Sequence, residues 1–175
     1  MNHLDNGDQQ ASGAFVLGLG CERGACADEV IALAEQALLL AGIDRRALIC
    51  VATLDVRLSE PAILAAAAHF AVPLKGFPAA VLEDATPRLE TPSDRVFALT
   101  GCHGVAEAAA LVGAGEVGDL VVPKAKSAHA TAAIAGCFSE SNQELTALSS
   151  VIDSGALRFD SRGRPISPVA AEVLA

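Results

Sequence analysis

Residues 14–24 read AFVLGLGCERG, and the fold can be worked out from this stretch. Residues 14–19 are a short apolar run typical of a buried strand, and the glycine-rich segment follows at once. Residues 27–41 then carry apolar side chains at helical spacing, with two acidic residues where the helix dipole favours negative charge. The stretch therefore predicts a strand, a tight loop and a helix that stops at Gly42.

The same alternation of strand and helix continues along the chain. Residues 48–53 form a continuous apolar run, typical of a strand that is buried on both faces of a parallel sheet. Ser59 is placed to cap a second helix that starts at Pro61 and runs through Phe70. Residues 72–77 predict a third strand, which is weakened by a proline and a glycine.

The second half of the chain begins with a polar surface connection, predicted for residues 83–94 from two prolines and several charges. Residues 95–100, RVFALT, predict a fourth strand. Residues 104–112 predict a third helix, in which Glu107 would complete a capping box on Gly104.

Two further strands are predicted at residues 119–123 and 130–138. The link between them is too short for a crossover helix, so this pair is expected to be antiparallel. The order of elements predicts an α/β fold, a single three-layer α/β/α domain with a mixed, mostly parallel sheet.

The predicted domain covers residues 13–138. Residues 1–12 are expected to be a disordered N-terminal segment. Residues 139–175 turn polar, and we expect a mobile or loosely docked tail with at most a short helix at 144–152.

Composition excludes several classes of function. The net charge is −9 and the chain has no Trp or Tyr, which argues against a nucleic-acid partner. No apolar run approaches the ~20 residues of a membrane span, and the first residues lack the features of a secretory signal. A cytoplasmic protein without a membrane partner is expected.

The chain has five cysteines and no C-x-x-C pair. Such a set indicates reduced thiols rather than a disulfide framework or a zinc knuckle. No metal and no cofactor is therefore expected.

The glycine-rich loop is the first candidate site. Its spacing, Gly18-x-Gly20-x-x-x-Gly24, matches neither a dinucleotide fingerprint nor a P-loop. Its N–H groups could hold a carboxylate or phosphate, or the glycines could serve only a tight turn. Arg23 favours binding, because a guanidinium at the C-terminal edge of a parallel sheet can form paired hydrogen bonds with a carboxylate. The candidate ligand-binding residues of this loop are Gly20, Cys21, Arg23 and Gly24.

The second candidate site is a cationic segment. Residues 121–136 contain no acidic side chain, whereas Lys124, Lys126, Ser127 and His129 lie within six positions. A solvated turn is the simpler interpretation. The apolar flanks nevertheless indicate that the sheet holds this segment in a fixed place, so Lys124, Lys126 and Ser127 are predicted to bind a ligand.

Catalytic candidates are fewer. Cys102 and His103 lie where a strand was predicted to end and a helix to begin, a position that suits a thiol nucleophile with a neighbouring base. A buried structural cysteine is the commoner alternative, since adjacent residues rarely point at each other. Cys21 and His129 are candidates on the same reasoning, and Asp55, after the second strand, is a further ligand-binding candidate.

Four blocks taken together resemble one family. They are GLGCERG at 18–24, ATLDVRLSEPAILAAAAHFAVPLKGFPAAVL at 52–82, GVAEAAAL at 104–111 and LVVPKAKSAHATAAIA at 120–135. In order and spacing this set resembles the CobE/CbiG C-terminal domain family of cobalamin biosynthesis, in its stand-alone form. The chain departs from the family's pattern at Glu22, where relatives often carry a basic residue.

The resemblance implies a three-layer α/β/α fold and work on corrin-ring intermediates, which are large tetrapyrroles with several acetate and propionate side chains. In CbiG-type proteins the domain belongs to a longer enzyme that opens the ring-A lactone of cobalt-precorrin-5A and releases acetaldehyde. Three roles stay open: binding or processing a polycarboxylate precorrin, acting on one as a small hydrolase or isomerase, or handing one to other cobalamin-pathway enzymes as a carrier or interaction module.

Overall fold

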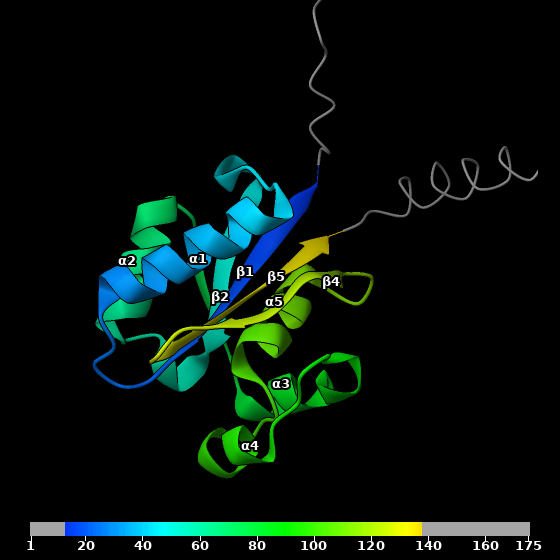
Figure 1. Cartoon of the computed structure of the whole chain (residues 1–175). Coiled ribbons are helices and arrows are strands. Elements are labelled where there is room, and N and C mark those ends of the chain that lie inside the picture. Colours follow the sequence, from blue (N-terminus) through cyan, green and yellow to red (C-terminus); the bar gives the residue numbers. More distant parts are fainter. Residues whose placement is uncertain (1–12, 138–175) are drawn as a thin grey trace, which may run out of the picture. The chain divides into compact units, whose positions relative to one another are not determined.

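The structure of the protein, a computed structural model, describes residues 13–137 (Figure 1). The predictions for residues 1–12 and for the tail at 139–175, including the short helix at 144–152, lie outside the described residues.

A five-stranded sheet forms the centre of the described part of the chain, with the strand order β3-β2-β1-β5-β4. β1 pairs in parallel with β2, and β2 with β3, whereas β5 is antiparallel to both β1 and β4. Only β5 therefore runs against the other strands, which confirms a mixed, mostly parallel sheet. The strands are β1 (Ala14–Cys21), β2 (Leu48–Leu54), β3 (Leu74–Phe77), β4 (Asp119–Lys126) and β5 (Ala130–Cys137).

Helices cover both faces of the sheet (Figure 1). Leu17 and Leu19 of β1 pack in one apolar cluster with α1 and α2, whereas Val16 packs on the other face with α5. This alternation of adjacent side chains produces the predicted three layers. The helices are α1 (Ala27–Ala41), α2 (Pro61–Phe70), α3 (Ala79–Asp84), α4 (Asp94–Thr100) and α5 (Val105–Ala114), with short 3-10 turns η1 (Arg45–Ala47), η2 (Asp55–Arg57) and η3 (Thr86–Arg88).

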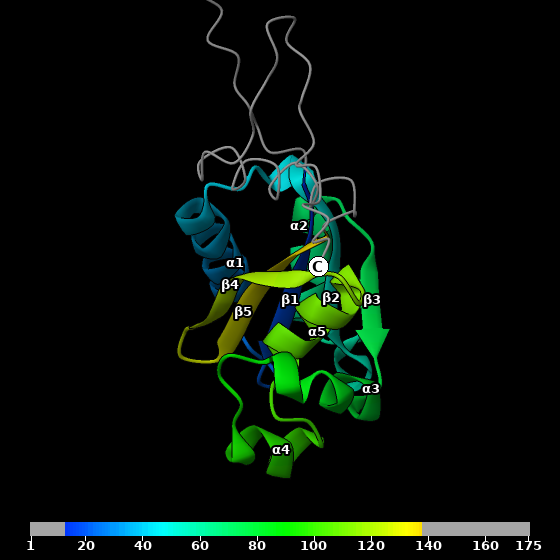
Figure 2. The ribbon, with the colours of Figure 1, turned by 90° about the vertical axis from the view of Figure 1, so that its right-hand side faces the viewer.

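We call the end of the sheet where β1, β2, β3 and β4 finish the carboxyl edge, and the opposite end the amino edge. In Figure 2, α3 and α4 lie beyond the end to which the β3 arrow points, which is the carboxyl edge. Since β5 is antiparallel, its first residues also lie there, beside the end of β1.

The strand predicted at residues 95–100 is wrong, because this segment is helix α4. The hydroxyl of Ser93 accepts a hydrogen bond from the Val96 N–H and caps the helix at its start. Gly101 ends it in the left-handed conformation at φ 80°. Val96 and Phe97 favour a strand by composition alone, but the two caps stabilise a helix.

The connection predicted for residues 83–94 holds more regular structure than expected, namely the end of α3 and the turn η3. The predicted caps also differ. Glu60, not Ser59, is the N-cap residue of α2. Gly104 is the N-cap of α5, but the Glu107 side chain turns into the protein and forms no capping box.

The last two strands are antiparallel, as predicted, but β4 is longer than expected. It continues to Lys126, so that Lys124 and Lys126 belong to the strand and only residues 127–129 form the turn.

Across residues 13–137, no single helix has the length and apolar character to cross a membrane. Helices α4 and α5 pass that test on length and composition only as a pair, and they are bent by 78° at the break between them.

Candidate functional site

The two predicted binding segments meet at the carboxyl edge of the sheet. Cys21, the last residue of β1, pairs with Ala130, the first residue of β5. The Glu22 N–H then donates a hydrogen bond of 2.9 Å to the His129 carbonyl. The glycine-rich loop and the β4–β5 turn therefore lie side by side, although they are far apart in the sequence (Figure 1).

The glycine-rich loop holds a carboxylate, but one of the protein's own. Gly24 has φ +74°, in the left-handed region that suits glycine. Its N–H donates to Glu60 Oε1 at 2.7 Å, and the other Glu60 oxygen lies 3.9 Å from the Arg57 guanidinium. The Gly24 amide is therefore occupied, whereas the exposed Arg23 side chain forms no ion pair within residues 13–137.

A second internal carboxylate occupies the β4–β5 turn. Glu29, in the first turn of α1, accepts hydrogen bonds from the Ser127 hydroxyl at 2.5 Å and from the His129 N–H at 2.8 Å. The Ser127 hydroxyl, followed by the His129 N–H, lowers the pKa of Glu29 below its usual 4.5. Ser127, predicted to bind a ligand, thus serves first to fix the turn.

We expect the Glu29→Ala variant to melt at a lower temperature than the wild type at neutral pH. A carboxyl group whose pKa is lowered by folding stabilises the folded state above its ordinary pKa, and this stabilisation is lost as the pH falls through the lowered pKa. The difference in Tm should therefore shrink as the pH drops below about 4.5. Thermal unfolding of both proteins over a pH series measures it, and a difference that stays constant with pH would contradict it.

The two lysines lie together on β4. Lys124 Nζ donates to the Thr91 carbonyl at 2.6 Å, and the pKa of its amine is lowered first by desolvation and then by the charge of Lys126. Lys126 is exposed, and neither ammonium forms an ion pair inside the described range. Lys126, Thr131 and Gly20 are neighbours across three strands, so the pair borders the glycine-rich loop.

Glu107 has a role in this region that was not predicted from the sequence. Its side chain is 1% exposed. Its carboxylate accepts hydrogen bonds from the Thr91 N–H at 3.1 Å, the Thr91 hydroxyl at 2.9 Å and the Lys124 N–H at 2.9 Å. The signal for it was a single acidic residue among the alanines of GVAEAAAL, since an unpaired carboxylate is rarely placed on an apolar helix face.

The thiol candidates do not have the surroundings of nucleophiles. Cys102 is fully buried, with its sulfur 3.4 Å from the Thr100 hydroxyl oxygen. Burial, followed by the charge of Glu60, raises the pKa of the Cys21 thiol. A raised pKa keeps this thiol protonated, and the thiolate is the reactive form.

His103 is a stronger acid–base candidate in the structure than in the sequence. Its Nδ1 lies 2.8 Å from Glu83 Oε1, and its ring stacks on Phe97 with the ring centres 4.5 Å apart. Its Nε2 faces Asp94, whose exposed carboxylate is 3.5 Å away. Its partner Glu83 lies in the segment predicted to be a surface connection, 20 positions away along the chain, and no local pattern links the two residues.

The remaining candidates are less constrained. His129 is exposed, with its Nδ1 3.1 Å from Glu22 Oε2. Asp55 is also exposed and accepts a hydrogen bond of 2.6 Å from the Val56 N–H next to it. Within residues 13–137 the structure brings together no group of three or more His, Cys, Asp or Glu side chains that could hold a metal ion.

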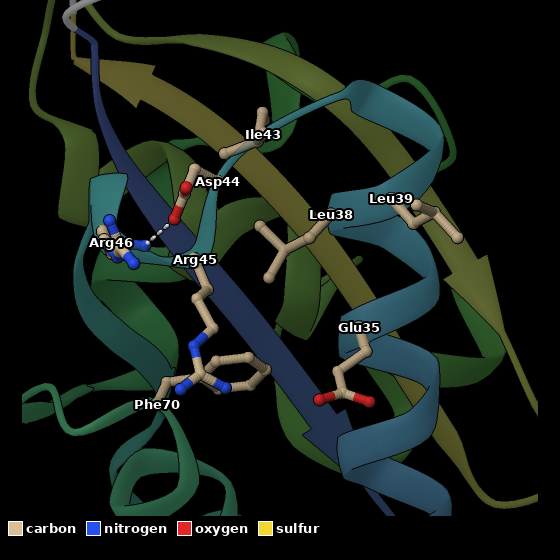
Figure 3. Close-up of a pocket in the computed structure, with 8 residues that line it drawn as sticks. All are labelled: Glu35, Leu38, Leu39, Ile43, Asp44, Arg45, Arg46 and Phe70. Atoms are coloured by element: carbon tan, nitrogen blue, oxygen red, sulfur yellow. Dashed lines mark hydrogen bonds between the residues drawn. The ribbon is translucent and has the colours of Figure 1, made fainter. Parts of the chain in front are cut away.

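A pocket of about 380 Å³ lies near the amino edge of the sheet, and Figure 3 shows the residues that line it. It is bounded by the end of α1, the turn η1 and Phe70, the last residue of α2. None of the predicted site residues lines it, so the residues that converge at the carboxyl edge and the pocket are two separate features.

Comparison with known proteins gives concordant matches. The family model "Cobalamin synthesis G C-terminus" matches residues 15–135. The chain is 61% identical over 127 residues to Protein CobE of a Sinorhizobium species, a match covering 73% of this chain and 82% of that protein. It is 27% identical over 132 residues to cobalt-precorrin-5A hydrolase of Priestia megaterium, covering 75% of this chain but only 34% of that protein.

Among solved structures, the crystal structure of CobE, a protein from the cobalamin biosynthetic pathway, matches with a TM-score of 0.68 and 34% identity. That match covers 73% of this chain and 93% of the other. The fold, the family match and the identity to CobE agree with one another. The chain therefore belongs to the CobE/CbiG C-terminal family and is a cobalamin biosynthesis protein.

Proposed function

We propose that the carboxyl edge of the sheet binds a corrin-ring intermediate through its acetate and propionate side chains. Arg23, Lys124 and Lys126 provide the contacts, because each can form charge-assisted hydrogen bonds with a carboxylate. The ligand class is inferred from membership of the cobalamin pathway.

The observation that carries this proposal is the pair of lysines on β4. Desolvation first, and then the charge of Lys126, lower the pKa of Lys124, against the opposite effect of the Glu107 carboxylate. No carboxylate of residues 13–137 forms an ion pair with either ammonium group. Bringing like charges together is unfavourable unless an anion compensates them. In a protein of net charge −9, such a pair marks a place where a ligand's negative charge is favourable.

The protein's own carboxylates already accept hydrogen bonds from part of the loop and of the turn, so only the other donors there can bind a ligand. Glu60 occupies the Gly24 N–H, and Glu29 occupies the Ser127 hydroxyl. Both keep the loop and the turn in a fixed shape. The ligand is therefore held by side-chain cations at the rim, and the backbone of the loop only positions them.

We expect the Lys124→Ala/Lys126→Ala variant to bind a carboxylate-bearing corrin intermediate roughly tenfold to a hundredfold more weakly than the wild type, since a hydrogen bond to a charged group contributes about 1.5–3 kcal/mol and an exposed ion pair less. Absorbance titration of the intermediate measures the affinity. In the variant the backbone N–H of residue 124 can still donate its hydrogen bond to the Glu107 carboxylate, so we expect the fold to be preserved.

The matched control removes two positive charges elsewhere, in a Lys75→Ala/Arg46→Ala variant. Lys75 lies within β3 and Arg46 in η1, before β2. The same ring with its carboxylates esterified is the ligand control and should bind weakly to every protein. Equal affinity of the wild type and the β4 double variant for the free acid would contradict the proposal.

A second candidate function is favoured by the His103–Glu83 pair. A carboxylate can only accept hydrogen bonds, so Nδ1 of His103 donates to Glu83, and this bond fixes the orientation of the ring. Nε2 lies 3.5 Å from the exposed Asp94 carboxylate, and it can accept a proton only in the neutral form of the ring. An imidazole oriented in this way can remove a proton from water or from a substrate. The relative from Priestia megaterium is named a hydrolase, and we propose hydrolysis of a precorrin as the alternative to binding alone.

We expect the His103→Gln variant to lose turnover of a precorrin while it retains binding, and Cys102→Ser to retain both. General-base catalysis contributes typically ~10²–10⁴-fold, so the loss is large if the reaction occurs. Product analysis by chromatography measures turnover, and circular dichroism checks the fold of each variant. Unchanged turnover in His103→Gln would exclude this histidine as the base.

A further inference from the structure

Three contacts that position helix α4 involve a single residue, His103. None of the seven residues of α4 is buried, so the burial of apolar side chains contributes little to its attachment. The Ser93 N–H, directly before the helix, donates a hydrogen bond of 2.8 Å to the His103 carbonyl. The Phe97 ring stacks on the imidazole, and the Asp94 carboxylate lies beside Nε2. The position of α4 therefore depends on the state of His103.

The His103 ring lies between two acids from different helices. Glu83 of α3 accepts a hydrogen bond of 3.0 Å from the His103 backbone N–H, and its other oxygen lies 2.8 Å from Nδ1. Asp94, the first residue of α4, has its carboxylate 3.5 Å from Nε2. These are the two charged side chains that the ring contacts within residues 13–137. The imidazole therefore joins α3 to α4.

The protonation state of the ring decides whether both contacts are favourable. The neutral ring has one N–H, which Nδ1 donates to Glu83, so the lone pair of Nε2 faces the Asp94 carboxylate. The protonated ring has an N–H on each nitrogen and can donate to both acids. Histidine changes its charge between about pH 5 and 8, where carboxylates are ordinarily ionised.

Glu83 stays ionised over the same range. Desolvation raises the pKa of its carboxyl group, but hydrogen bonds from the His103 N–H and the Thr86 hydroxyl outweigh it, so that the pKa lies below its usual 4.5. A contact that favours the charged form of a histidine stabilises the structure at low pH, and this stabilisation is lost as the pH rises. The attraction between His103 and α4 therefore weakens from about pH 5 to 8.

We propose that His103 is a pH-dependent link between α3 and α4, which holds α4 when the ring is protonated and releases its first turn when the ring is neutral. Figure 2 shows α4 beyond the carboxyl edge of the sheet, so its release changes the surface at that end of the domain. The same loss of a proton leaves Nε2 able to accept one. The link operates in the free protein, whether or not the carboxyl edge binds a corrin ring.

Hydrogen exchange of the full chain, followed by mass spectrometry, tests this proposal. After correction for the intrinsic effect of pH on amide exchange, the protection of α4 should fall about two- to fivefold between about pH 5.5 and pH 8, as expected for the loss of one exposed ion pair. His69→Gln is the matched control. His69 also lies 2.8 Å from a carboxylate, that of Glu35, but on α2, so this variant should keep the wild-type trend in α4.

Substitutions of Asp94 test the pairing itself. In Asp94→Asn the change of α4 protection with pH should vanish, although protection falls at every pH because an acid in the first turn favours a helix. Asp94→Lys should reverse the trend, since an ammonium group can donate to the neutral ring and is repelled by the protonated one. Protection of α4 in the wild type that does not fall with pH, or an Asp94→Asn variant that keeps the wild-type trend, would overturn the proposal.

Discussion

Replacement of Gly18 by alanine is expected to destabilise the domain more than any other single-methyl change considered for this protein. Gly18 lies in the middle of β1, where it pairs with Ala52 and Ala133. A Cβ atom there would lie 1.9 Å from the Ala106 carbonyl oxygen and 2.7 Å from the Ala110 nitrogen. Both contacts are backbone atoms of α5, so no side-chain rotation can relieve them.

Helix α5 would have to move away from the sheet, which opens the apolar cluster on that face. We expect a loss of about 3 kcal/mol or more in the free energy of unfolding, from a total that for a domain is roughly 5–15 kcal/mol. Denaturant and thermal unfolding of the purified variant measure the loss.

Gly20→Ala is the matched control. Its Cβ would lie 2.7 Å from the Thr131 hydroxyl oxygen and 3.3 Å from the Val105 Cβ, which are side-chain atoms. We expect a loss of about 1 kcal/mol, since these neighbours can shift. Equal stability of the Gly18 and Gly20 variants would show that α5 does not approach β1 as closely as described.

The second large effect is expected at Glu107. The Glu107→Ala variant removes the buried carboxylate that accepts three hydrogen bonds. The donors are the Thr91 N–H, the Thr91 hydroxyl and the Lys124 N–H. A buried donor without a partner costs about 1–3 kcal/mol, but Thr91 is exposed and Lys124 is half-buried, so water can replace part of these bonds. The variant should therefore lose about 2–3 kcal/mol of stability.

Glu107→Gln separates the loss of hydrogen bonds from the loss of volume. It keeps the shape of the side chain but replaces one acceptor oxygen by an amide group, so that one of the donors faces a donor. A loss of about 1 kcal/mol is expected, between the wild type and Glu107→Ala. If Glu107→Ala unfolds at the same denaturant concentration as the wild type, the network is not part of what holds α5, β4 and the Thr91 segment together.

Much of the fold could be predicted because its signals are local. In residues 14–41 the apolar run, the glycines and the helical spacing occur in one continuous stretch, and β1 and α1 form there. The short link before Ala130 likewise decided that the last two strands are antiparallel, since no crossover fits within it.

Residues 95–100 show where local composition is not enough. Their branched and aromatic side chains favour a strand, but a strand also needs a neighbour to accept its hydrogen bonds. In the sheet formed by the described residues, this segment pairs with no strand. The caps at Ser93 and Gly101 satisfy the ends of a helix instead.

The candidate site also has features that local sequence predicts and features that depend on packing. The local pattern is enough to predict that these cations and glycines reach the carboxyl edge, because the ends of parallel strands and the turn beside them must meet there. Which of these groups stay open to a ligand depends on how the layers of the domain pack. Glu60 reaches Gly24 across 36 positions, and Glu29 reaches Ser127 across 98. Hydrogen bonds over such separations depend on how the layers pack, and no local pattern of residues records them.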